Sequence, residues 1–104
     1  REALAQFSNV DLQMKFYSFV NTVVCGHNVM LSRTGYTGEL GFEIYASNSV
    51  IIDIWKKFQN WGVVPCGLAA RDLLRMEMKY CLYGNEIDQS TNPLEAGLNW
   101  ITDF

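Results

Sequence analysis

The chain has 104 residues, of which 49% are hydrophobic, 13% aromatic and 18% charged, and its net charge is −3. This composition excludes disorder, which needs few aromatic residues and a high net charge, and it excludes the basic face of a nucleic-acid-binding protein. No stretch approaches the roughly 20 apolar residues of a membrane span, so we expect a single cytoplasmic domain over residues 1–104.

The first half of the chain predicts three strands after a short helical stretch. Apolar residues at helical spacing over residues 1–7 favour the end of a helix. Aromatic and β-branched residues favour strands over residues 16–24 and 28–33, and strand character returns over residues 42–46. These three strands are expected to form an antiparallel sheet.

A glycine-rich stretch, residues 33–41 (RTGYTGELG), lies between the second and third predicted strands. Glycine at this density indicates positive φ angles or close backbone approach. No Gly-Lys-Ser/Thr follows it, which excludes a P-loop, and it leads into a strand instead of a helix, which excludes a dinucleotide-binding fingerprint. On spacing alone, a tight hairpin loop is the simplest interpretation.

Glu43 is a candidate site residue because it is a carboxylate in an otherwise apolar strand. Successive strand side chains point to opposite faces, so Glu43 and Tyr45 are expected on the face opposite Phe42, Ile44 and Ala46. A buried charge is costly unless it is paired or hydrogen-bonded. Glu43 therefore either faces water on an alternating strand or lines a pocket and accepts hydrogen bonds from a ligand's N–H groups.

The second half of the chain predicts two helices. Over residues 50–61, Ile51, Ile54, Trp55 and Phe58 recur at the spacing of one helix face, and Gly62 occupies the position of a helix-ending glycine. A short strand is expected over residues 63–66, a second helix over 67–78 and an extended segment over 80–83. The order of elements indicates an α+β fold, an antiparallel sheet with two helices packed on one face.

Arg71 is a second candidate, near the start of the second predicted helix, with Arg75 one turn later and Asp72 and Glu77 nearby. One interpretation is a surface ion-pair network, which would add little stability. The other is a contact with an anion or carboxylate near the helix start, where backbone N–H groups strengthen the field.

The three cysteines, Cys25, Cys66 and Cys81, are odd in number and widely spaced, so no disulfide framework is expected. Cys25 and His27 form a Cys-x-His pair, but His27 is the single histidine and no Cys-x-x-Cys is present. A zinc site needs four suitable ligands, and the three cysteines and this histidine would have to converge from distant positions, so no metal site is expected.

Three segments resemble the T-protein of the glycine cleavage system, a folate-dependent aminomethyltransferase. They are residues 32–44 (SRTGYTGELGFEI), 66–77 (CGLAARDLLRME) and 81–88 (CLYGNEID), which occur in the order and at the spacing typical of that family. Lys79 stands where the family pattern has glycine, and Glu86 replaces an aspartate. Because the family's chains are several times longer than this one, the resemblance implies an internal fragment, the second-domain region of a three-domain T-protein and the junction that follows it.

The resemblance implies a reaction and its partners. T-proteins take an aminomethyl group from the lipoyl arm of the H-protein, transfer the one-carbon unit to tetrahydrofolate and release ammonia. Glu43 matches the family glutamate that binds the pterin, as a carboxylate can accept both the N3–H and the 2-amino N–H. Tyr36 matches a tyrosine near the pterin, and Arg71 matches a substrate-binding arginine.

The family's catalytic aspartate belongs to an upstream segment, so no catalytic residue is expected in this chain and the isolated chain is expected to be inactive. Two alternatives stay open. One is the one-carbon domain of a sarcosine or dimethylglycine dehydrogenase, against which residues 81–88 argue. The other is a non-catalytic folate-binding module, which only the upstream sequence would distinguish from the enzyme.

Overall fold

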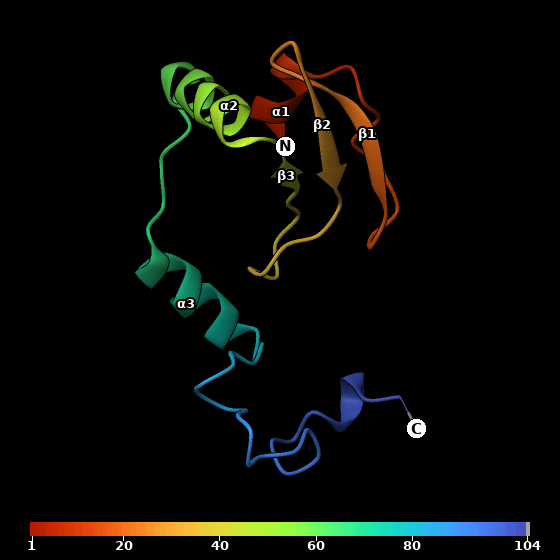
Figure 1. Cartoon of the computed structure of the whole chain (residues 1–104), viewed down its shortest axis with the longest axis vertical. Helices are drawn as coiled ribbons and strands as arrows, with labels where there is room; N and C mark the ends of the chain where they lie inside the picture. The colour runs from red at the N-terminus through yellow and green to blue at the C-terminus, as the bar shows by residue number, and fades with distance from the viewer. Residues whose placement is uncertain (104) are drawn as a thin grey trace.

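The computed structural model describes residues 1–103 and places a sheet with two helices at one end and a third helix with the C-terminal segment at the other (Figure 1). The sheet has three antiparallel strands in the order β1-β2-β3, which are Phe19–Val24, His27–Ser32 and Glu43–Tyr45. The predicted antiparallel sheet is therefore confirmed, with strand ends shifted by a few residues.

The turn between β1 and β2 sets the register of this hairpin. It consists of Cys25 and Gly26, whose φ angles are 55° and 84°. Two residues with positive φ form the type of turn whose twist matches that of the flanking strands. Val24 consequently pairs with His27, and the ladder runs on to the pairing of Phe19 with Ser32.

The core lies between the sheet and helices α1 (Glu2–Phe7) and α2 (Asn48–Trp61). Its buried members come from the sheet, from α1 and from α2, and are Leu4, Val24, Val29, Leu31 and Ile54. Phe42, Ile44 and Ala46 pack against this core, as the alternation along the third strand predicted. Glu43 and Tyr45 therefore lie on the face directed away from it.

Helix α2 confirms the predicted helix over residues 50–61 but differs from it in one side chain. Gly62 ends the helix with φ 104°, and the Val63 N–H donates to the Phe58 carbonyl at 3.0 Å, as in a Schellman cap. Phe58 stacks on Phe7 of α1. Trp55, predicted on the same apolar face, is instead 54% exposed.

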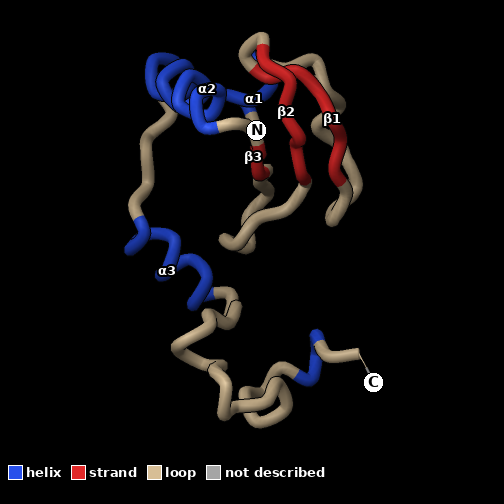
Figure 2. Tube along the Cα trace, viewed as in Figure 1, coloured by secondary structure: helices blue, strands red, loops and turns tan. Residues whose placement is uncertain are grey.

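Helix α3 (Leu68–Glu77) forms as expected but does not pack on the sheet beside α2, so the prediction of two helices on one face is wrong in this respect (Figure 2). The predicted strand over residues 63–66 is absent, and this segment is a linker that leads away from the sheet. The periodicity of α3 identified an apolar face but not its partner. Helices α1 and α2 already cover the core, and Leu68 and Leu73 of α3 are 83% and 59% exposed.

After α3 the chain continues in turns through residues 80–98 to a 3-10 helix, Asn99–Ile101. The extended segment expected over residues 80–83 contains no strand, although Tyr83 forms an isolated bridge with Ile87. None of the helices within residues 1–103 combines the length and apolar character that crossing a membrane requires.

The end of α3 allows a test of backbone strain. Lys79 has φ 58°, and the Tyr80 N–H donates to the Arg75 carbonyl at 2.8 Å, so Lys79 occupies the left-handed position of a helix cap. A side chain is disfavoured in this conformation. We expect Lys79→Gly to raise the free energy of unfolding by about 0.5–1 kcal/mol, measured by urea denaturation.

Lys56→Gly is the matched control, because Lys56 is an exposed residue inside α2. Glycine inside a helix costs about 1 kcal/mol, so this substitution should lower the free energy of unfolding. If both substitutions destabilise the chain equally, the left-handed cap at Lys79 is not present in solution.

Candidate functional site

The glycine-rich loop, residues 33–41, connects β2 to β3 and reaches toward the end of α3 (Figure 1). At its base, Arg33 donates a 2.9 Å hydrogen bond from Nη1 to the Gly41 carbonyl and lies over the Phe42 ring. At its tip, Gly38 has φ 74°, and a Cβ there would overlap the Met78 side chain. The glycine thus serves a close approach between the loop and the end of α3.

Tyr36 lies in the middle of this loop and contacts Arg71, so two of the predicted site residues are neighbours. The guanidinium carbon of Arg71 lies 4.5 Å from the centroid of the Tyr36 ring, which is a cation–π contact. The ring also stacks with Tyr80 at 5.7 Å between centroids, and the Tyr36 hydroxyl donates to the Cys81 carbonyl. The loop is therefore held against α3 and the segment that follows it.

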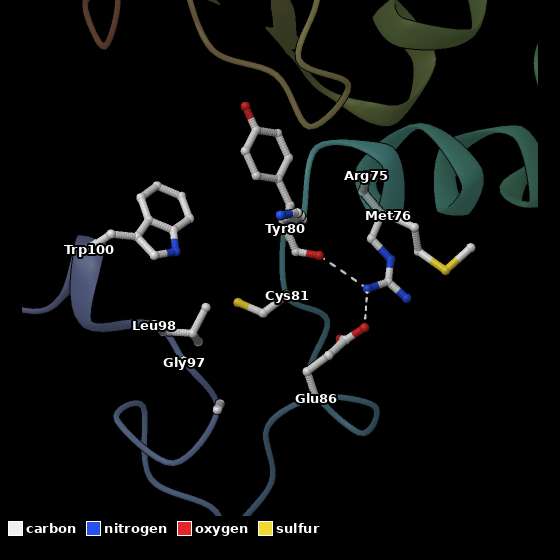
Figure 3. A pocket seen from close by; sticks show the side chains of 10 residues that line it. Arg75, Met76, Tyr80, Cys81, Glu86, Gly97, Leu98 and Trp100 are labelled. Atoms are coloured by element: carbon white, nitrogen blue, oxygen red, sulfur yellow. Dashed lines mark hydrogen bonds and ion pairs between the residues drawn. The ribbon is translucent and has the colours of Figure 1, made fainter.

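The two arginines of α3 have different environments. Arg75 is 2% exposed and is hydrogen-bonded to the carboxylates of Asp72 and Glu86 at 2.7 Å each and to the Tyr80 carbonyl at 3.1 Å. Figure 3 shows the contacts with Glu86 and Tyr80. Arg71 is exposed and makes no ion pair within residues 1–103. The ion-pair interpretation therefore applies to Arg75, as a buried network instead of a surface one, and Arg71 keeps its charge available for a ligand.

The carboxylate of Glu86 is held in its charged form. Its Oε2 accepts a 2.9 Å hydrogen bond from the Leu82 N–H, which, together with the Arg75 guanidinium, keeps the pKa of Glu86 below its ordinary value. Hydrogen bonds to Glu86 and then Asp72 raise the pKa of Arg75 in turn. Arg75 and Glu86 therefore both stay in their charged forms.

Glu43, at the start of β3, has one oxygen occupied by neighbours. Its Oε2 accepts hydrogen bonds from the Thr34 hydroxyl and, at 3.3 Å, from the Tyr45 hydroxyl. Thr34 is also 2.9 Å from the Ser32 hydroxyl. No hydrogen bond from residues 1–103 reaches Oε1 of Glu43. The two hydroxyls bound to Oε2 orient the carboxylate, and Oε1 can accept a hydrogen bond from a ligand.

The predicted site residues thus fall into two groups. Tyr36 and Arg71 are in contact, whereas Glu43 stands at the far end of the same loop and is linked to it through Thr34. The sequence did not point to Thr34 or Glu86, and it did not reveal that Arg75 is buried and paired with two carboxylates. A hydroxyl nine residues before a carboxylate carries no local signal, and Glu86 is separated from Arg75 by a turn.

Two open hollows accompany these residues. One cleft is lined by Tyr36, Arg71, Leu68 and Leu82, so the predicted cation faces an open space. A larger hollow of about 620 Å³ lies between the end of α3 and the C-terminal segment (Figure 3). Trp100 lines this second hollow, but none of the three predicted site residues does. Residues 1–103 contain no group of three His, Cys, Asp or Glu side chains that would hold a metal ion.

Comparison with known proteins identifies relatives along the whole chain. A family model described as the GCVT N-terminal domain matches residues 1–104. The aminomethyltransferase of Halothermothrix orenii is 47% identical over 109 residues, which is 100% of this chain and 30% of that protein. Those of Chloroherpeton thalassium and Flavobacterium psychrophilum are each 50% identical, over 95% and 99% of this chain and 29% and 30% of their own lengths. The chain therefore spans about three tenths of the length of these relatives.

The position of Glu43 can be tested through Tyr45. The negative charge of Glu43 is the main cause that raises the pKa of the Tyr45 hydroxyl. In Glu43→Gln this charge is lost, so the Tyr45 pKa should fall toward its ordinary value, as followed by NMR titration of the labelled ring. Glu39→Gln, a matched change in the loop with no contact to Tyr45, should leave that pKa unchanged. An unchanged Tyr45 pKa in Glu43→Gln would mean that the two side chains are not neighbours.

Proposed function

The chain belongs to the family of the GCVT N-terminal domain, and on this basis we propose that it is the folate-binding part of a glycine cleavage aminomethyltransferase. The full-length protein would take the aminomethyl group from the lipoyl arm of the H-protein and transfer the one-carbon unit to tetrahydrofolate, with release of ammonia. The match to aminomethyltransferases along the whole chain supports this proposal. The second-domain position, the cytoplasmic location and the H-protein as partner stay predictions.

The observation that carries the folate part of the proposal is the state of Glu43. Hydroxyl groups of Thr34 and Tyr45 hold its Oε2, which orients the carboxylate and leaves Oε1 for a ligand. A pterin presents an N3–H and a 2-amino N–H side by side, and a carboxylate accepts such a pair of donors. The Tyr45 hydroxyl makes the longer contact, at 3.3 Å, and Tyr45 is 49% exposed, so it is the contact that a bound pterin would replace.

Arg71 would supply the positive charge of the site, and the Tyr36 ring would support its guanidinium. The Tyr36 hydroxyl is engaged by the Cys81 carbonyl, and the Tyr36 ring contacts Arg71 and Tyr80, so this residue would hold Arg71 in place beside the ligand. Arg71 rests on that ring and lines an open cleft. An exposed guanidinium without an ion pair suits an anionic group of the substrate, which it would bind through paired N–H donors.

We expect Glu43→Ala to weaken tetrahydrofolate binding at least about tenfold in a full-length aminomethyltransferase that carries these residues. Two charge-assisted hydrogen bonds would be lost, at about 1.5–3 kcal/mol each, although such losses are not additive. Isothermal calorimetry on the purified variant and parent measures the Kd. Glu39→Ala, in the same loop, is the control and should bind normally. A change below about threefold for Glu43→Ala would remove this residue from the pocket.

The 104-residue chain by itself is expected to be folded but inactive, because the family's catalytic aspartate lies outside it. Large apolar side chains such as Leu68, Leu73 and Trp100 are exposed, at 83%, 59% and 61%. Exposed apolar surface favours association, so light scattering should show a rising mass at high concentration. Ammonia release with tetrahydrofolate and aminomethylated H-protein should equal the uncatalysed rate. Turnover above that rate would require a catalytic group among Asp72, Asp88 and Glu43.

A further inference from the structure

We propose that Arg75 and Glu86 are a positioning pair that sets the place of Arg71 in the proposed site. Within residues 1–103, neither Arg75 nor Glu86 forms a hydrogen bond with Tyr36 or Arg71. They act through residues 80–82, which lie shortly after the end of α3, and through Tyr36. The inference rests on the proposed function, because it assigns a role toward Arg71 as a substrate-binding residue.

The first step is the burial of the Arg75 guanidinium. A charge that is 2% exposed has to be compensated by its surroundings. Asp72 supplies one carboxylate from the same helix, and Glu86 supplies the other from the turn beyond residues 80–82. Removing one partner of a buried pair leaves an uncompensated charge, so the chain between Arg75 and Glu86 is constrained to return toward α3.

The second step is the hold on the intervening backbone. Arg75 donates to the Tyr80 carbonyl at 3.1 Å, while Glu86 accepts from the Leu82 N–H at 2.9 Å. Arg75 and Glu86 therefore hold the backbone by hydrogen bonds on both sides of Cys81. Figure 3 shows the bond to the Tyr80 carbonyl. The direction of the Cys81 carbonyl follows from these two contacts.

The third step leads to the substrate side. The Cys81 carbonyl accepts the hydrogen bond of the Tyr36 hydroxyl, and the Tyr80 ring stacks on the Tyr36 ring. Arg71 then lies on Tyr36, 4.5 Å from its centroid. Arg71 and Arg75 belong to the same helix, so the contacts form a closed circuit from α3 through residues 80–82 and Tyr36 back to α3.

The circuit has a functional consequence for Arg71. A long exposed arginine otherwise samples many rotamers, and ordering it on binding carries an entropic cost. The Tyr36 ring restricts the guanidinium before any ligand arrives. A displacement of the order of 1 Å at a binding group is sufficient to lower turnover strongly, so a loosened segment 80–82 should be felt at Arg71.

Glu86→Gln is the diagnostic variant, because glutamine has the same shape but one oxygen and one NH2 group. Glu86 uses one oxygen for Arg75 and the other for the Leu82 N–H. In glutamine one of these two donors must face the NH2 group, so one contact is lost. Glu86→Asp keeps both oxygens on a shorter side chain and should restore part of the effect. Glu95→Gln is the matched control, as Glu95 accepts from the Asn92 N–H without contacting Arg75.

The first readout is NMR of the 104-residue chain with labelled arginine. The Tyr36 ring should shift the Arg71 side-chain protons upfield, and Tyr36→Leu should abolish this shift. Glu86→Gln should reduce the shift by at least half, Glu86→Asp should retain more of it, and Glu95→Gln should retain all of it. A shift that is absent from the unmodified chain, or unchanged in Glu86→Gln, would overturn the proposal.

The second readout is steady-state kinetics in a full-length aminomethyltransferase that carries these residues. Glu86→Gln should lower kcat/KM about tenfold, and in an Arg71→Lys background it should lower it less than about twofold further, because the residue it positions is already impaired. A purely structural role predicts additive losses in the double variant, which would overturn the inference. If Arg71→Lys alone is fully active while the NMR coupling is present, the assignment of Arg71 to the substrate fails and the positioning circuit stands.

Discussion

The arrangement of the candidate site depends on the contact between the glycine-rich loop and the chain that follows α3. The Tyr36 hydroxyl donates to the Cys81 carbonyl, and Gly38 approaches the Met78 side chain so closely that a Cβ at this position would require Met78 to move. The loop belongs to the sheet, and its partner belongs to the other end of the molecule (Figure 1). This contact is therefore what places a cation from α3 beside a loop whose far end carries Glu43.

The two ends of the molecule are stabilised by different forces. The sheet end buries leucine, valine and isoleucine side chains between the strands and two helices. The other end has the Arg75 ion pairs and short polar turns, in which Asp88 accepts from the Ser90 and Thr91 backbone N–H groups. Several of its large apolar side chains, such as Leu68, Leu73 and Trp100, are exposed, which fits a chain that spans about three tenths of the length of its relatives.

In the proposed function, Glu43 beside the loop and Arg71 of α3 would match a folate-like ligand in the sign of their charges. A carboxylate at one end of the loop accepts N–H groups, and a guanidinium held on Tyr36 attracts an anionic group. Both groups are oriented before a ligand binds, Glu43 by two hydroxyls and Arg71 by an aromatic ring. Such preorganisation lowers the entropic cost of binding.

The sequence by itself determined the three strands of the sheet, two helices and the family, because these depend on local periodicity and on contiguous motifs, but it wrongly predicted a strand over residues 63–66. It predicted the faces of the third strand correctly, since alternation is a property of every strand. It could not place α3, because periodicity identifies an apolar face and not the surface that covers it. Only the tertiary structure showed that Arg75 is buried and Arg71 is not, although both lie one turn apart on one helix. Glu86 and Tyr36 approach α3 from distant positions in the chain: Glu86 pairs with the Arg75 guanidinium, whereas Tyr36 offers Arg71 an aromatic ring and no carboxylate.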